Sequence, residues 1–153
     1  MLKFKKQIKK GVLELANVSF FDGLICVVGS FSNFLSKEWV NHLIDHYKDK
    51  VKISFAFNSE NIKGIMIDNV GSIEKIMTHL IRDLKCKTIG YISGPLVNEE
   101  AELRYEAYKL MLNDYSIEIS KQFFYEGYFM ESSGKNAIKD LFKKGSKIPD
   151  AIV

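Results

Sequence analysis

The sequence predicts an α/β fold in which helices cover parallel sheets. Short apolar runs alternate along the chain with segments of about 10–15 residues whose apolar positions recur at helical spacing, a pattern typical of strand–helix–strand units. Gly and Pro separate such segments, most clearly at Gly94 and Pro95, which stand between an apolar run and a strong helix former. Because crossovers between parallel strands are almost always right-handed, we expect α/β/α layers.

The chain opens with a predicted amphipathic helix over residues 2–16. Apolar residues recur there at helical spacing, namely Phe4, Ile8, Val12 and Leu15. Lysines crowd the same segment, at Lys3, Lys5, Lys6, Lys9 and Lys10. We favour lysines on the solvated face of this helix, and a phosphate-binding arm is the alternative.

Three strands are predicted in the first half of the chain. Residues 24–28 are apolar without alternation, as expected of a strand covered on both faces. Apolar and other residues alternate over residues 51–57, which predicts a strand with unlike faces. Between these strands, Ser36 is a suitable N-cap for a helix with one apolar face. A third strand, residues 64–67, leads to Asp68.

The second half continues the alternation. A helix opening at Gly71 is expected to bury a set of apolar residues: Ile73, Ile76, Met77, Leu80, Ile81 and Leu84. A strand over residues 88–93 and a helix follow. A strand over residues 123–128 comes next, then a helix that Ser132 can cap, and residues 151–153 begin another strand.

Length and composition indicate a globular protein. The chain has 153 residues, 46% apolar and 27% charged, and a net charge of +3 that does not by itself argue for a nucleic-acid partner. Cys26 and Cys86 do not have the spacing of a ligand pair, which suggests a reducing, cytoplasmic location. No signal peptide and no apolar run of ~18 residues is present, so we expect no membrane span.

From about Phe20 onward the sequence resembles the ligand-sensing core of LacI/GalR-type transcriptional regulators, which have a periplasmic-binding-protein-like fold. The order and spacing of eight short segments carry the resemblance: residues 21–25 (FDGLI), 67–69 (IDN), 79–81 (HLI), 89–95 (IGYISGP), 104–108 (RYEAY), 126–129 (EGYF), 133–134 (SG) and 149–153 (PDAIV). The stretch from Glu99 to Tyr105 is also similar to sensor cores linked to GGDEF or kinase domains.

The resemblance implies two partial lobes. Residues 1–68 would be the later part of the N-terminal lobe, and residues 69–153 the first part of the C-terminal lobe. The family's opening strand and helix, the closing part of its second lobe and its helix-turn-helix head have no counterpart here, so the chain is expected to be truncated at both ends. The usual Leu-Gly-His before the central strand is replaced by residues 84–86 (LKC).

Arg104 and Phe129 are the first candidates for ligand binding. A guanidinium offers a planar fork of donors, suited to vicinal hydroxyls or a carboxylate. By resemblance, Arg104 matches the family arginine that reaches into the interlobe cleft. Its alternative role is a surface ion pair with Glu100, four residues earlier. Phe129 matches an aromatic cleft position in the family, where its ring could stack on a sugar or base, and a core position is its alternative.

Three further residues are weaker candidates. Asp68 ends a predicted strand, where it could accept hydrogen bonds from ligand hydroxyls or cap the turn that contains Asn69. Ser30 and Phe31 follow the predicted strand over residues 24–28 at its carboxyl end, where they could line the cleft.

The sequence offers little support for catalysis, a metal or a cofactor. His42 and His46 are four residues apart, but Leu43 stands where the zinc-protease pattern requires Glu. Gly134-Lys135 superficially resembles a phosphate loop, yet Phe129 stands where the earlier glycine would be, and Asn136 replaces Ser or Thr.

These observations predict a non-catalytic, cytoplasmic sensor of a sugar-like small molecule that signals by lobe closure. The output would lie on a DNA-binding head, a GGDEF domain or a kinase outside this chain, and a homodimer is the expected assembly. The alternative is a truncated interaction or dimerisation module that pairs through unfinished sheets without binding a ligand.

Overall fold

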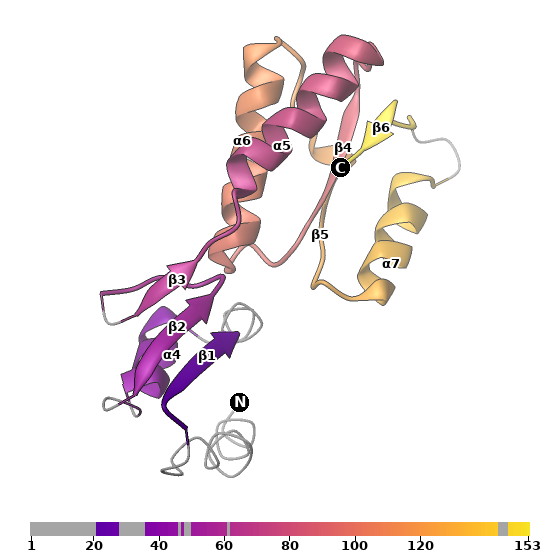
Figure 1. Cartoon of the computed structure of the whole chain (residues 1–153). Coiled ribbons are helices and arrows are strands. Elements are labelled where there is room, and N and C mark those ends of the chain that lie inside the picture. Colours follow the sequence, from indigo (N-terminus) through magenta and orange to yellow (C-terminus); the bar gives the residue numbers. More distant parts are fainter. Residues whose placement is uncertain (1–20, 28–35, 46, 48–49, 61, 144–146) are drawn as a thin grey trace. The chain divides into compact units, whose positions relative to one another are not determined.

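The computed structural model describes residues 21–27, 36–45, 47, 50–60, 62–143 and 147–153 (Figure 1). The chain divides into two compact units, Met1–Ile67 and Asp68–Val153, each of which is described by itself. The predicted helix and lysine segment over residues 2–16, together with Ser30, Phe31 and His46, lie outside the described residues.

The first unit contains a parallel sheet with strand order β1-β2-β3. Its described elements in chain order are β1 (Gly23–Val27), α4 (Lys37–Asp45), β2 (Val51–Phe55) and β3 (Lys63–Ile65). Ser36 caps α4 as predicted, because its Oγ accepts a hydrogen bond from the backbone N–H of Trp39 at 3.4 Å. The apolar residues Val40 and Ile44 of α4 form a small core with Phe57 and Ile62.

One face of this sheet carries the core, and the other is apolar and exposed. Cys26 packs against the core, and Ser54 is fully buried on the same face. Opposite them, Ile25 lies beside Ile53 in the strand register, and Ile25 is 77% exposed. The prediction that β1 is covered on both faces is therefore wrong for the described part of the unit, because α4 covers only the Cys26 face.

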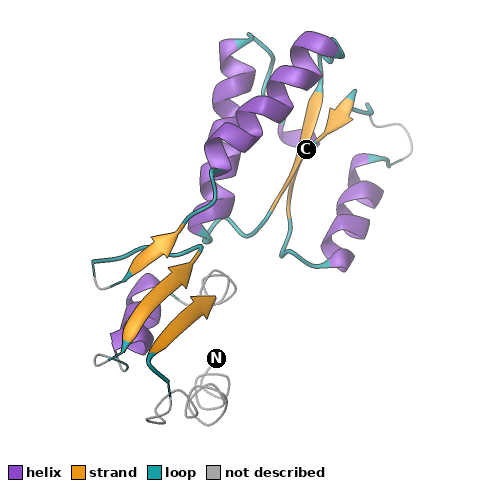
Figure 2. Cartoon of the chain, in the orientation of Figure 1, coloured by secondary structure: helices purple, strands orange, loops and turns teal. Residues whose placement is uncertain are grey.

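The second unit contains another parallel sheet, of order β5-β4-β6. Figures 1 and 2 show α5 and α6 on one side of this sheet and α7 on the other. These parallel sheets confirm the predicted α/β class. The elements in chain order are α5 (Asn69–Thr78), a π-helical turn η1 (His79–Asp83), β4 (Ile89–Ser93), α6 (Glu99–Asp114), a 3-10 turn η2 (Lys121–Phe123), β5 (Phe124–Glu126), α7 (Glu131–Leu141) and β6 (Ala151–Ile152).

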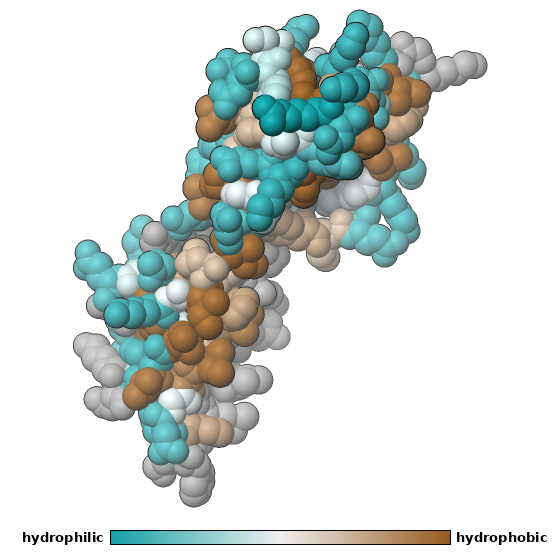
Figure 3. Space-filling view, turned by 45° about the horizontal axis from the view of Figure 1, so that its top comes forward, coloured by the Kyte–Doolittle hydropathy of each residue, from teal (hydrophilic) through white to brown (hydrophobic). Residues whose placement is uncertain are grey.

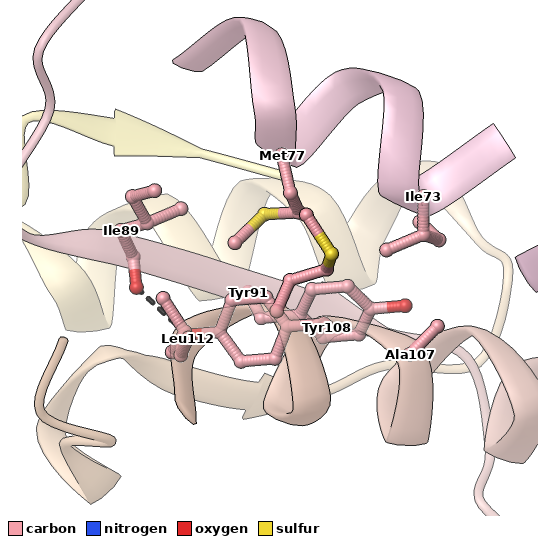
Figure 4. Close-up of a cluster of buried hydrophobic side chains, with 8 residues drawn as sticks. Ile73, Met77, Ile89, Tyr91, Ala107, Tyr108 and Leu112 are labelled. Carbon is pink, nitrogen blue, oxygen red and sulfur yellow. Dashed lines mark hydrogen bonds between the residues drawn. The ribbon is translucent and has the colours of Figure 1, made fainter. Parts of the chain in front are cut away.

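The core of the second unit joins α5, β4 and α6 (Figure 4). Its buried residues are Ile73, Met77, Ile89, Tyr91, Ala107, Tyr108, Met111 and Leu112. Tyr108 donates a hydrogen bond of 2.7 Å from its hydroxyl to the backbone oxygen of Ile89, which satisfies the polar end of a buried ring. Burial, together with the neighbouring Tyr105 and Tyr91, raises the pKa of Tyr108 to about 12.

Two predictions for the helices of this unit are wrong. Of the residues expected to be buried after Gly71, Leu84 is 59% exposed and Ile76 is also exposed. The π-helical turn explains Leu84, because an extra residue per turn shifts the positions that follow away from the buried face. Ser132 lies inside α7 rather than at its N-cap, which is Met130.

Asp150 fixes the edge strand β6 beside β4. Its Oδ2 accepts hydrogen bonds from the backbone N–H groups of Lys87 and Thr88, both at 2.8 Å. Its own N–H donates to the backbone oxygen of Thr88 at 2.8 Å. The hydrogen bonds that the Asp150 carboxyl accepts, that from Lys87 foremost and then those from Thr88, lower its pKa from the ordinary 3.8.

We expect this carboxylate to make the stability of the chain depend on pH. Because its pKa is lower in the folded state, its contribution is fully present above the unfolded pKa and is lost as the pH falls through the folded pKa. In urea unfolding from pH 7 to pH 3, the stability difference between wild type and Asp150→Ala should be constant near neutrality and shrink below about pH 4. Asp114→Asn, at an exposed position of the same unit, is the control. A difference that grows on acidification would contradict this role.

Candidate functional site

The candidate site lies in the second unit, around the turn between β4 and α6. In an open parallel sheet, ligands bind beyond the carboxyl ends of the strands, and this turn follows the carboxyl end of β4. Asn98 caps α6, since its Oδ1 accepts from the backbone N–H of Ala101 at 3.0 Å. Acidic residues in the first turn add a favourable interaction with the helix dipole. Arg104 therefore lies in the second turn of a helix whose N-terminus is capped.

Asn69 holds the guanidinium of Arg104. Arg104 donates from Nη1 to Asn69 Oδ1 at 2.6 Å, and Asn69 donates from Nδ2 to Glu100 Oε1 at 3.3 Å. We call these three residues the polar triad. Asn69 is only 5% exposed, so its amide is shielded from competing water. The surface pair considered for Glu100 and Arg104 is thus replaced by an arrangement in which Asn69 bonds to both.

Phe129 lies next to the polar triad. The Arg104 Cζ atom is 6.0 Å from the centre of the Phe129 ring, at the outer limit for a cation–π contact. Phe129 has a positive φ of 57° and is 51% exposed. Such exposure excludes the alternative that Phe129 is a core residue. A half-exposed ring beside a guanidinium offers both an apolar surface and hydrogen-bond donors.

Two hydrogen bonds join the loop that carries Phe129 to the turn after β4. Gly127 donates from its N–H to the backbone oxygen of Ser93 at 2.9 Å. Leu96 donates from its N–H to Glu126 Oε1, also at 2.9 Å. The positions of Phe129 and Arg104 are therefore linked through neighbouring strands of one sheet, β4 and β5.

Asp68 has a structural role in the same region. Its Oδ1 accepts a hydrogen bond from the N–H of Gly71 at 2.9 Å, which makes it the N-cap of α5. Its backbone oxygen accepts a further bond of 2.6 Å from the hydroxyl of Ser72. Of the two roles considered for Asp68, capping is observed, and its contact with a ligand stays a prediction.

The sequence does not single out Asn69 and Glu100 as parts of the site. The sequence predicts Glu100 only as an ion-pair partner of Arg104, and Asn69 only as part of a turn and of the segment 67–69 that carries the resemblance. Nothing in the spacing indicates that Asn69, 35 residues before Arg104, lies within hydrogen-bonding distance of it. That proximity arises from the packing of α5 against α6.

The arrangement offers chemical groups that can bind a small molecule. The polar triad supplies a guanidinium, an amide and a carboxylate, and Phe129 supplies an aromatic face, a combination suited to a small molecule with hydroxyl groups. Among the described residues, no group of three or more potential metal-binding side chains occurs. His42 lies on α4 of the first unit, and His79 pairs with Asp83 at 2.7 Å.

Solved structures of similar fold include LacI-family regulators. A LacI-family transcriptional regulator from Mycobacterium smegmatis has a TM-score of 0.72 and 16% identity, with 92% of this chain and 50% of that chain covered. The complex of the transcriptional regulator CelR with cellobiose has a TM-score of 0.70 and 20% identity, with 91% of this chain and 41% of that chain covered. A sugar-binding LacI-family regulator from Escherichia coli, complexed with phosphate, has a TM-score of 0.66 and 17% identity. The match covers 95% of this chain and 49% of that chain.

These likenesses confirm the expected fold, which is the periplasmic-binding-protein-like fold of LacI-type regulators. The chain spans about half the length of the structures that it matches. No protein-family model matches the sequence, and no curated protein sequence does either. Within the part of the chain that the structure describes, no helix has both the length and the apolar character needed to cross a bilayer.

We expect Asn69→Ala to destabilise the chain by about 1–3 kcal/mol, because it leaves two partly buried charged side chains without their shared partner. Urea unfolding at neutral pH measures this difference. Asn136→Ala, at an exposed position on α7, should change stability by less than about 0.5 kcal/mol. Equal effects of the two substitutions would show that Asn69 does not hold Arg104.

Proposed function

We propose that this chain, which has the fold of LacI-type regulators, is part of a non-catalytic sensor core that binds a sugar or a related polar metabolite. The observation that carries the proposal is the guanidinium of Arg104, held by the shielded amide of Asn69 beside the half-exposed ring of Phe129. The names of similar structures support this ligand class, since one is a cellobiose complex and another is described as sugar-binding.

Recognition would use the two kinds of surface that the site offers. Arg104 uses Nη1 for Asn69, and its remaining N–H groups would donate to neighbouring ligand hydroxyls. Glu100 would accept from a further hydroxyl. The ring of Phe129 would lie against the apolar face of the sugar, as aromatic side chains do in many polar sites. Asp68, Ser30 and Phe31 are proposed as additional contacts.

Signalling would follow from closure of two lobes around the ligand. In this proposal, residues 1–68 belong to the N-terminal lobe and residues 69–153 to the C-terminal lobe. A ligand shifts the equilibrium between open and closed forms only by its difference in affinity for them. The response would pass to an output module outside this sequence, whether a helix-turn-helix head on DNA, a GGDEF domain or a kinase, in the cytoplasm.

A second candidate function, association through an apolar surface, is favoured by one observation. The sheet of the first unit has an exposed face, which we call the apolar face, and brown side chains gather on this unit in Figure 3. Its residues are Ile25, Val27, Val51, Ile53, Phe55 and Ile65. Contiguous apolar surface of this kind is typical of an interaction site. A homodimer would bury it, with or without a bound ligand.

Thermal unfolding with a panel of mono- and disaccharides tests the sensing proposal. A sugar at 100 times its dissociation constant should stabilise the wild-type chain by about 2.7 kcal/mol. Arg104→Ala should abolish this stabilisation. Arg82→Ala, which removes an arginine over the ring of Tyr115 in the same unit, should retain it. A shift that survives in Arg104→Ala would refute the site, and no shift at millimolar sugar would refute this ligand class.

Light scattering coupled to size exclusion tests the association proposal. The wild-type chain should elute as a dimer or larger species, because burial of the apolar face removes it from water. Ile25→Lys should reduce the mass towards that of the monomer. Val97→Lys, at an exposed valine of the second unit, should leave the mass unchanged. A monomeric wild-type chain would refute association through the apolar face.

A further inference from the structure

Gly94, the residue directly after β4, lies against the ring of Phe129. A Cβ atom added to Gly94 would come within 2.1 Å of Cζ and 2.3 Å of Cε1 of Phe129, and its three nearest neighbours all belong to this ring. Such distances are far below any van der Waals contact. No residue other than glycine can therefore occupy position 94 while the ring keeps its place.

Phe129 reaches this place through a strained backbone conformation. Its φ of 57° lies in the left-handed region, which is uncommon for a bulky residue. Conformations of this kind persist only when the surrounding structure holds them, and they concentrate at functional sites. Here the preceding residues are held by hydrogen bonds, from Gly127 N–H to Ser93 at 2.9 Å and from Tyr128 N–H to Ser133 Oγ at 3.1 Å.

The ring that fills the space above Gly94 also approaches Arg104. Its centre is 6.0 Å from the Arg104 Cζ, and the side chain stays half-exposed. Gly94 and Arg104 belong to one strand–turn–helix stretch, in which β4 ends at Ser93 and α6 begins at Glu99. The same stretch therefore provides both the space for the ring and the guanidinium beside it.

We infer that Gly94 is a positioning residue: the absence of its side chain creates the seat that holds the Phe129 ring beside Arg104, and so sets the aromatic surface available to a ligand. The steric part of this inference is independent of any ligand. The part that concerns ligand preference rests on the proposed function.

Nuclear magnetic resonance of the full chain with ¹⁵N-labelled arginine tests the steric part. The Nε–Hε signal of Arg104, assigned by its loss in Arg104→Lys, senses the ring current of Phe129. Gly94→Ala should move this signal towards its position in Phe129→Ala, because both substitutions take the ring away. Gly134→Ala is the matched control, since a Cβ there would meet no atom within 4 Å. An unmoved Arg104 signal in a folded Gly94→Ala would overturn the inference.

Thermal unfolding of the double variant tests whether Gly94→Ala destabilises the chain by displacing the Phe129 ring or by a general loss of packing. Gly94→Ala should lower the melting temperature, because the ring of Phe129 must leave its place. The same substitution made in Phe129→Ala should have much less effect, because the obstructing ring is gone. Should Gly94→Ala not fold at all, the double variant should restore folding. If Gly94→Ala destabilises the wild type and Phe129→Ala equally, or if the double variant does not restore folding, the proposed contact between Gly94 and the ring would be contradicted.

A sugar that stabilises the wild-type chain tests the ligand part. Gly94→Ala and Phe129→Ala should each weaken its binding by about tenfold, the loss expected for one aromatic contact. The double variant should bind no more weakly than either. If Gly94→Ala binds like the wild type, the ring surface is not used for the ligand. If no sugar binds the wild type, the proposed function fails. The positioning of the Phe129 ring by Gly94 is then tested by the spectra and the melting temperatures alone.

Discussion

The hydrogen bond of 2.6 Å between Arg104 Nη1 and Asn69 Oδ1 is the interaction on which the candidate site depends. A free arginine side chain has roughly 2 kcal/mol of rotamer entropy to lose when it binds a ligand. Asn69 has already restricted this side chain, and its own position is fixed at the buried start of α5. The guanidinium is thus preorganised by a neutral partner, which leaves its positive charge without a direct ionic neighbour in the polar triad.

The core of the second unit makes this hydrogen bond possible. Met77 of α5 and Leu112 of α6 are fully buried in one cluster with β4, so the two helices cannot separate without exposing it. Asp68 and Asn98 cap the two helices at their starts. These caps set where each helix begins, and therefore where Asn69 and Arg104 lie along them. Packing and capping together bring the two side chains into register.

Much of the fold could be predicted from the sequence, because it depends on periodicity. The alternation of apolar runs with helical patterns predicted parallel sheets, and Ser36 was correctly expected to cap α4. Burial was harder to predict. Nothing in the apolar run of β1 indicates that, within the described part of the unit, a helix covers only one of its faces, and a π-helical turn before Leu84 leaves no clear signal. Such features are set by tertiary packing.

The site was predictable only in part, for the same reason. Arg104 and Phe129 could be named because short segments around them resemble those of LacI/GalR-type cores. Asn69 and Gly94 lie in such segments too, residues 67–69 and 89–95, but the segments do not show what these two residues do. Their importance lies in contacts across the fold: one amide facing a guanidinium on another helix, and one missing Cβ beneath a ring. Sequence spacing encodes neighbours within an element, whereas these contacts join different elements.

A crystal structure of the chain with a sugar that stabilises it would test the central claim most directly. The account predicts the sugar within hydrogen-bonding distance of Arg104, with its apolar face on the ring of Phe129 and the bond from Arg104 to Asn69 intact. A sugar bound elsewhere, with no contact to Arg104, would contradict it.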